Sequence, residues 1–201
     1  MRSLLIAPEN EVPIAVPVSL ELGRASDAAV LLTSLTAYST GMEVAVSLRV
    51  RPSARRRSVP LHQLISGFGL DDLDGTGAFL LGVQYSDGRR AMTAGRHAMQ
   101  APNRGLAQRE LFLTLGSSTG TDCTYDLRLW LSPLPPAGPV TLVCRWPDYD
   151  ISDTTSTLDG AAIASAGRAA VELWPEEFVD EQAPTPRNPP IPDSGWFAGQ
   201  D

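Results

Sequence analysis

Apolar and polar residues alternate with a period of two along most of the first three quarters of this 201-residue chain. The pattern is clearest over residues 42–51, where every second residue is Met, Val or Leu. Successive side chains of a β-strand point to opposite faces, so this period is typical of a strand with one buried face. A chain made mainly of such segments must bury one face of each strand, which predicts packed antiparallel sheets.

Short polar stretches separate the predicted strands and indicate how they connect. Ser39-Thr40-Gly41 lies between residues 28–38 and residues 42–51, which predicts a hairpin. Ser86-Asp87-Gly88 predicts a second hairpin. The other predicted strands are residues 12–22, 78–85, 89–93, 110–115, 124–131, 140–146 and 151–158.

Prolines shape two further expectations. Proline has no backbone donor, so Pro13 and Pro17 predict that residues 12–22 form an edge strand. Residues 132–139 are rich in proline, and we expect them to join the strands before and after them as a hairpin. The expected register pairs Leu131 with Leu142, Leu129 with Cys144 and Leu127 with Trp146, which leaves Cys123 away from Cys144 and argues against a direct cross-strand disulfide.

Two short helices are expected. The Ser-x-Pro pattern at residues 58–60 indicates a helix start, and apolar residues at helical spacing from Leu61 predict a helix that ends near Gly67. Asp159 is expected to cap an alanine-rich helix over residues 160–170. The small residues of this second helix would let it lie close against the sheet.

Eight or nine strands joined mostly by short turns predict a mainly β fold, an antiparallel β-sandwich or partly open barrel with one or two short helices. Residues 1–175 are expected to form a single β-rich domain, because a chain of this length buries enough surface for one core. Residues 176–201 are rich in proline and acid, and we expect a C-terminal tail that is disordered unless a partner orders it.

Composition excludes several classes of function. All sixteen basic residues are arginine, which excludes chemistry that needs a lysine Schiff base. The net charge of −7 opposes general attraction to nucleic acid or anionic lipid. No apolar stretch is long enough to span a membrane, and the run Leu4–Ala7 is too short for a signal peptide. With only Cys123 and Cys144 as thiols, the expected location is the reducing cytoplasm.

Several proline-rich pieces carry a resemblance. They are the stretch Pro8–Pro13, the stretch Pro133–Pro139 before a strand that ends Trp146-Pro147, and the closing Leu173-Trp174-Pro175. Over roughly residues 5–175 the chain resembles a family of uncharacterised cytosolic proteins from high-GC, actinobacterial-type bacteria. The resemblance implies no activity, no catalytic residue and no ligand.

The sharpest string in the chain is Asp72-Leu73-Asp74-Gly75-Thr76. It fits the DxDGT signature of haloacid-dehalogenase-type phosphotransferases, in which the first aspartate is the nucleophile and the second a general acid. That chemistry needs a preceding parallel strand and alternating β and α units, which the sequence pattern does not predict. An Asp-Gly turn before the next strand is the simpler interpretation.

Carboxylates in two loops suggest a metal site instead. Hard cations such as calcium take several carboxylate oxygens from loops, and some β-sandwich modules bind calcium between two acidic loops at one end. The site requires that both loops meet, and solvated acidic loops are the alternative. The candidate ligands are Asp71, Asp72 and Asp74 in the first loop and Asp148, Asp150 and Asp153 in the second.

A second catalytic pattern lacks its context. Residues 116–120 fit GxSxG, but a nucleophile elbow passes directly into a helix and its histidine follows the serine. Here His62 and His97 both precede Ser118, and a strand is expected after it. We therefore expect a hairpin turn at residues 116–120 and assign no catalytic residue.

Arg49, Arg51, Arg55, Arg56 and Arg57 crowd into nine positions. Such a patch can hold phosphates or an acidic protein surface through charge-assisted hydrogen bonds. The alternative is a solvated loop neutralised by the molecule's own acids, and the absence of interleaved aromatics argues against nucleic acid.

In the tail, a proline-rich stretch over residues 184–192 precedes Trp196 and Phe197, which is a pattern typical of a docking segment. The leading hypothesis is a non-enzymatic interaction module that binds a protein partner or a second copy of itself. One alternative is a calcium or magnesium sensor, or a phosphotransfer enzyme, that uses Asp72 and Asp74. Another is local polyanion binding by the patch from Arg49 to Arg57.

Overall fold

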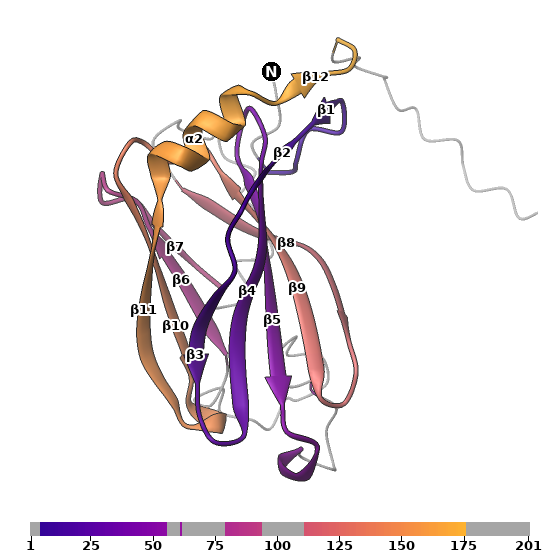
Figure 1. Ribbon diagram of the computed structural model, residues 1–201, viewed down its shortest axis with the longest axis vertical. Helices are drawn as coiled ribbons and strands as arrows, with labels where there is room; N and C mark the ends of the chain where they lie inside the picture. The colour runs from indigo at the N-terminus through magenta and orange to yellow at the C-terminus, as the bar shows by residue number, and fades with distance from the viewer. Residues whose placement is uncertain (1–4, 56–60, 62–78, 94–110, 176–201) are drawn as a thin grey trace, which may run out of the picture.

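The computed structural model describes residues 5–55, 61, 79–93 and 111–175. They form a mainly β structure of antiparallel sheets that do not close into a barrel, as the alternation predicts (Figure 1). The strands are β1 (Glu11–Val12), β2 (Ile14–Val16), β3 (Leu20–Arg24), β4 (Ala28–Ala37), β5 (Met42–Val50), β6 (Leu80–Gln84), β7 (Arg90–Met92), β8 (Phe112–Gly120), β9 (Thr124–Ser132), β10 (Pro139–Trp146), β11 (Ile151–Asp159) and β12 (Val171–Glu172). The helical elements are η1 (Pro52–Ala54), η3 (Pro147–Tyr149) and α2 (Gly160–Arg168).

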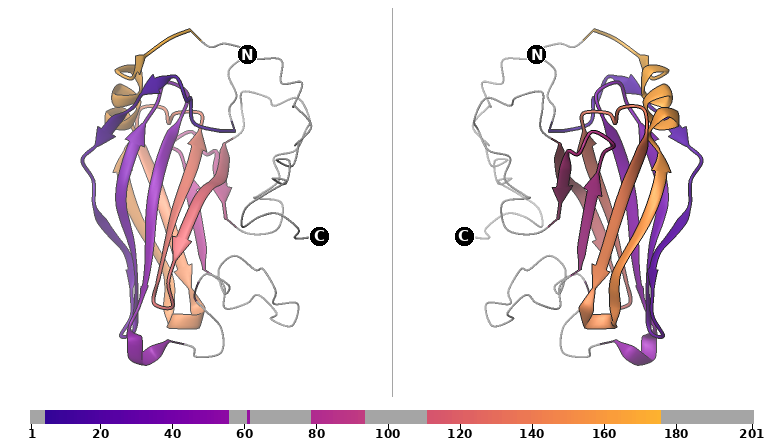
Figure 2. Two further views of the ribbon diagram at one scale, coloured as in Figure 1. Left: turned by 90° about the vertical axis from the view of Figure 1, so that its right-hand side faces the viewer. Right: turned by 90° about the vertical axis from the view of Figure 1, so that its left-hand side faces the viewer.

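Two large sheets pack face to face (Figure 2). The six-stranded sheet has the order β2-β4-β5-β9-β8, with β3 also paired to β4, and the four-stranded sheet has the order β11-β10-β6-β7. β1 and β12 form a separate two-stranded ribbon. The predicted hairpins β4–β5 and β6–β7 are confirmed. The single strand predicted over residues 12–22 is instead divided among β1, β2 and β3, of which β2 and β3 lie at a sheet edge as Pro13 and Pro17 predict.

One hydrophobic core fills the space between the large sheets. Apolar side chains of the alternating strands point inward, so Leu32 and Leu48 of one sheet share the core with Leu81, Leu142 and Trp146 of the other. These five residues are buried almost completely. Burial of about 25 cal/mol per Å² of apolar surface makes this core the main stabilising contribution to the fold.

The expected pairing of β9 with β10 is wrong. β9 pairs with β5 and β8, whereas β10 pairs with β6 and β11. Leu129 therefore lies opposite Val44 and Leu115, and Cys144 lies opposite Leu81. The proline-rich connection crosses from one sheet to the other, and alternation determines which face of a strand is buried without determining which strand lies beside it.

The expected turn at residues 116–120 is also wrong, because these residues continue β8 as far as Gly120. The turn comes at Thr121–Cys123, where the Thr121 backbone N–H donates to the Thr124 carbonyl at 2.8 Å. A bulge between Leu115 and Ser117 shifts the register of β8 against β9. The flexible residues Gly and Ser had indicated a turn, but pairing with β9 keeps the segment extended.

The second predicted helix is confirmed as α2. The Asp159 side chain accepts hydrogen bonds from the backbone N–H groups of Ala161 and Ala162, which is an N-cap. A Cβ on Gly167 would lie 2.6 Å from the Tyr38 carbonyl oxygen, so the absence of a side chain lets the helix approach the sandwich closely. Of the first predicted helix only Leu61 is described, and it is helical and buried; the rest lies outside the described residues.

The sandwich is closed along one side by β3 and β11. The Thr154 hydroxyl on β11 donates to the Leu22 carbonyl on β3, and its oxygen also lies 3.2 Å from the Cys144 carbonyl. These contacts join the edge of the four-stranded sheet to the edge of the six-stranded sheet. β3 and β11 therefore contact each other along this side of the sandwich.

Candidate functional site

The structure describes only part of the residues that the sequence singles out. Asp148, Asp150, Asp153 and Arg55 are described. The acids of the first acidic loop, two patch arginines and the tail aromatics lie outside the described residues: Asp71, Asp72, Asp74, Arg56, Arg57, Trp196 and Phe197.

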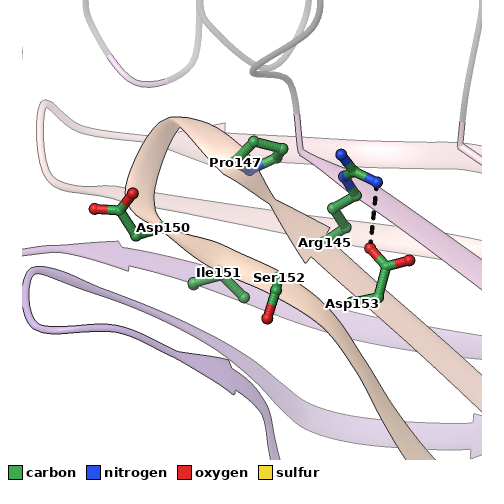
Figure 3. Close-up of a pocket in the computed structure, with 6 residues that line it drawn as sticks. All are labelled: Arg145, Pro147, Asp150, Ile151, Ser152 and Asp153. Atoms are coloured by element: carbon green, nitrogen blue, oxygen red, sulfur yellow. Dashed lines mark ion pairs between the residues drawn. The ribbon is translucent and has the colours of Figure 1, made fainter.

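A pocket of about 590 Å³ lies at the β10–β11 turn (Figure 3). Asp150 sits in this turn with a left-handed φ of 57°, whereas Asp153 lies on β11, 3.5 Å from the Arg145 guanidinium. Figure 3 shows the two carboxylates at opposite ends of the pocket. The lining residues are Arg145, Pro147, Asp150, Ile151, Ser152 and Asp153.

The acids of this turn do not form a cation site by themselves. Among residues 5–55, 61, 79–93 and 111–175, no group of three or more His, Cys, Asp or Glu side chains is placed to hold a metal ion. Asp148 lies in η3, and Asp150 is the residue that ends this helix. Asp153 forms an ion pair with Arg145. The predicted site also needs the first acidic loop, which lies outside the described residues.

Each described arginine of the Arg49–Arg57 patch faces an acid of the same molecule. All these side chains are substantially exposed, and exposed ion pairs contribute little to stability. A polyanion would have to replace the acids one by one, which agrees with the interpretation of a loop neutralised by the protein itself. The pairs are Arg49 with Asp126 at 3.6 Å, Arg51 with Asp27 at 3.3 Å and Arg55 with Asp122 at 2.8 Å.

Cys144, Tyr85 and Ser118 lie in surroundings that do not activate their side chains for chemistry. Burial raises the pKa of the Cys144 thiol to about 11, so this cysteine is a neutral core residue rather than a nucleophile. Burial also raises the pKa of Tyr85, whose hydroxyl donates to the Pro133 carbonyl at 2.9 Å. Ser118 accepts a hydrogen bond from the Tyr125 hydroxyl at 2.9 Å and lies within a strand, where no nucleophile elbow forms.

The β1–β12 ribbon exposes apolar side chains. Val12 pairs directly with Val171, and the Leu173 backbone N–H donates to the Asn10 carbonyl at 2.8 Å, which extends the ladder by one pair. Alternation along a strand then puts Val12, Val171 and Leu173 on the same side of the ribbon, and Trp174, the next residue in the chain, is exposed where the ribbon ends. We call these four residues the ribbon face; their exposed fractions are 45% for Val12, 55% for Val171, 50% for Leu173 and 55% for Trp174.

The ribbon is anchored on its other side. Glu11 points away from the ribbon face and is buried, and its carboxylate accepts hydrogen bonds from the backbone N–H and the hydroxyl of Ser39 in the β4–β5 turn. The Asn10 side-chain amide donates to the Trp174 carbonyl at 2.7 Å. Figure 1 shows the ribbon at the end of the sandwich, beside α2. The exposed apolar residues are therefore held in a defined position.

Sequence reasoning missed this surface. Residues 171–173 read Val-Glu-Leu, which is a short alternation, but a two-residue strand is too brief for a period to be recognised. Its partner Glu11–Val12 lies about 160 residues earlier in the chain, so no local turn signal connects the two. Only the tertiary structure brings them together.

Within the described part of the chain, no helix has the length and apolar character needed to cross a membrane. No protein-family model, curated protein or solved structure matches the chain, so the resemblance to uncharacterised bacterial proteins stays a prediction.

Proposed function

We propose that this protein is a non-enzymatic interaction module that binds another protein through the ribbon face. The observation that carries the proposal is the exposure of four adjacent apolar residues on an anchored two-stranded ribbon. Single exposed apolar residues are common, but a contiguous group held in place by hydrogen bonds is typical of a contact surface. Trp174 is the natural anchor, because tryptophan is enriched among residues that dominate binding energy.

The surroundings of the ribbon face indicate the chemistry of its partner. Glu9 is exposed two residues before β1, Glu172 is exposed on the side of the ribbon opposite to the ribbon face, and the whole chain carries a net charge of −7. A second copy would bring like charges together, whereas a partner that mixes apolar and basic residues would match both the ribbon face and the acidic protein around it. Within the described residues β12 pairs only with β1, so an extended partner segment can add to the ribbon as a third strand.

Two further parts of the proposal rest on the sequence. The described cysteines, Cys123 and Cys144, are free thiols, which supports a reducing, cytoplasmic location. The segment after Pro175 leads to Trp196 and Phe197, and we propose it as an additional docking segment for the same or another partner.

A peptide-binding experiment tests the ribbon face. The probe is a fluorescent synthetic peptide of alternating valine and lysine, compared with a matched peptide of alternating valine and glutamate, and binding to the full-length protein is followed by fluorescence anisotropy. We expect the lysine peptide to bind more tightly. Trp174→Ala should weaken it by about tenfold or more, because truncating an aromatic anchor removes on the order of 2 kcal/mol.

Met92→Ala is the matched control, because Met92 is an equally exposed apolar residue on β7, away from the ribbon. It should leave binding unchanged. Equal binding of the two peptides, no binding of either, or equal effects of the two substitutions would each contradict the proposal.

A further inference from the structure

We propose that two copies of the chain associate edge to edge through β8, in antiparallel orientation about a two-fold axis at Ser118. This inference concerns a different surface from the ribbon face and does not depend on the proposed function. β8 ends beside the Thr121–Cys123 turn, and the Cys123 carbonyl accepts from the Val50 backbone N–H at 2.8 Å. The ribbon is anchored at the opposite end of the same sheet, at the β4–β5 turn.

The C-terminal half of β8 is an exposed edge. Residues 116–120 are all exposed, and among the described strands β8 pairs only with β9. Figure 1 shows β8 as the outermost strand of its sheet. An edge strand presents a row of backbone N–H and C=O groups that can pair with another strand.

The other edges of the two large sheets each have a flanking proline, a charged side chain or a short strand. Pro13 and Pro17 flank β2, and β11 carries the charged side chain of Asp153 and is joined to β3 through Thr154. β7 is three residues long and follows Arg89. In contrast, residues 111–121 contain no proline and no charged side chain, and the bulge between Leu115 and Ser117 lies at the start of the segment that would pair.

The register with β9 makes β8 complementary to itself. Ser117 lies opposite Arg128, and Thr119 lies opposite Asp126. An axis at Ser118 places Ser117 of one copy opposite Thr119 of the other. A row of residues across the four strands then has Arg128 of one copy at one end and Asp126 of the other copy at the other end. The two-fold axis produces two such rows.

Neighbouring registers lack this balance. An axis at Ser117 would put Arg128 of both copies on one row, so two positive charges would share it. An axis at Thr119 would put Asp126 of both copies on one row, so two negative charges would share it. The row charges lie three strand spacings apart, about 14 Å between Cα atoms, so they influence register more than affinity. Both also have partners in their own copy, since Arg128 pairs with Glu43 and Asp126 with Arg49. Backbone hydrogen bonds of the added strand would supply the affinity.

A charge-reversal experiment tests the axis. In analytical ultracentrifugation at high micromolar concentration, we expect the full-length wild type to dimerise. Ser118→Lys and Ser118→Asp should each raise the dissociation constant by at least about tenfold, because the axis places each new charge opposite its own copy. An equimolar mixture of the two variants should dimerise again. A merely structural effect of the substitutions would not be rescued by mixing.

Ser34→Lys is the matched control, because Ser34 is an exposed residue of β4 in the same sheet, and it should leave dimerisation unchanged. A wild type that stays monomeric, charged variants that dimerise like the wild type, or a mixture without rescue would overturn the proposal. If the charged variants do not fold, Ser118→Cys in a Cys123→Ser background takes their place. Oxidation should then cross-link it as a dimer more readily than Ser34→Cys in the same background, and equal cross-linking would overturn the proposal.

Discussion

Two described residues show how burial turns a reactive group into a structural one. The Tyr85 hydroxyl is enclosed and donates to the Pro133 carbonyl, which joins β6 to the connection between the sheets. The Cys144 thiol points into the core beside Thr154, and desolvation is the main cause of its raised pKa. No described charged group shifts the pKa of Cys144, and burial outweighs the effect of the Arg89 guanidinium, which lies 5.3 Å from the centre of the Tyr85 ring. The same apolar surroundings that stabilise the fold thus suppress chemistry at these positions.

At the residue scale, the raised pKa of Cys144 predicts a loss of stability at alkaline pH. The folded thiol keeps its proton up to about pH 11, whereas the unfolded thiol ionises near its ordinary value of 9.0. Between these values the unfolded state binds fewer protons, so the contribution of this group is fully present below pH 9.0 and is lost as pH rises toward 11. Urea denaturation at pH 8 and pH 10 should show a larger loss for the wild type than for Cys144→Ala. An equal loss in both proteins would contradict the assignment.

Along one side of the sandwich, the two large sheets are held together by contacts between β3 and β11. β11 and β3 are neighbours across the sandwich without being paired in a common sheet, and Thr154 provides the described hydrogen bond between them. A bulge between Glu21 and Gly23 bends β3 toward β11, where a Cβ on Gly23 would lie 2.7 Å from the Ile151 side chain. The close approach of these two strands therefore depends on a glycine and one hydroxyl.

At the element scale, Thr154→Val should weaken the β3–β11 edge. The change keeps the shape of the side chain but removes the donor to the Leu22 carbonyl, which leaves that acceptor unsatisfied. We expect the free energy of unfolding to fall by about 1–3 kcal/mol in urea denaturation. Thr154→Ser keeps the hydroxyl and should retain more of the stability. If valine is as stable as wild type, the hydrogen bond does not contribute to closing this side.

At the scale of the whole molecule, one core is shared by the two large sheets. Buried tryptophans report on both: Trp146 lies on β10 in the core, and Trp130 on β9 is buried against Tyr38 on the outer side of the six-stranded sheet. Neither sheet can bury its inner face without the other, so the two should unfold together.

Leu142→Ala tests this coupling. Leu142 is almost completely buried, and its truncation should lower the free energy of unfolding by about 2–5 kcal/mol. Far-ultraviolet circular dichroism and tryptophan fluorescence should give coincident transitions in the wild type and in the variant, because removal of one core residue weakens both sheets at once. Separate transitions in the variant would show that the sheets unfold independently.

The sequence by itself determined the mainly β class, the hairpins β4–β5 and β6–β7, and the cap of α2 at Asp159, because these depend on local periodicity and turn chemistry. Alternation also identified Leu127, Leu129 and Leu142 as inward-facing. The partner of each strand depends instead on contacts between distant residues. For that reason only the tertiary structure placed β9 and β10 in different sheets and continued β8 through the expected turn. The same holds for the ribbon face, since Val12 and Val171 become neighbours only when the two ends of the described chain meet.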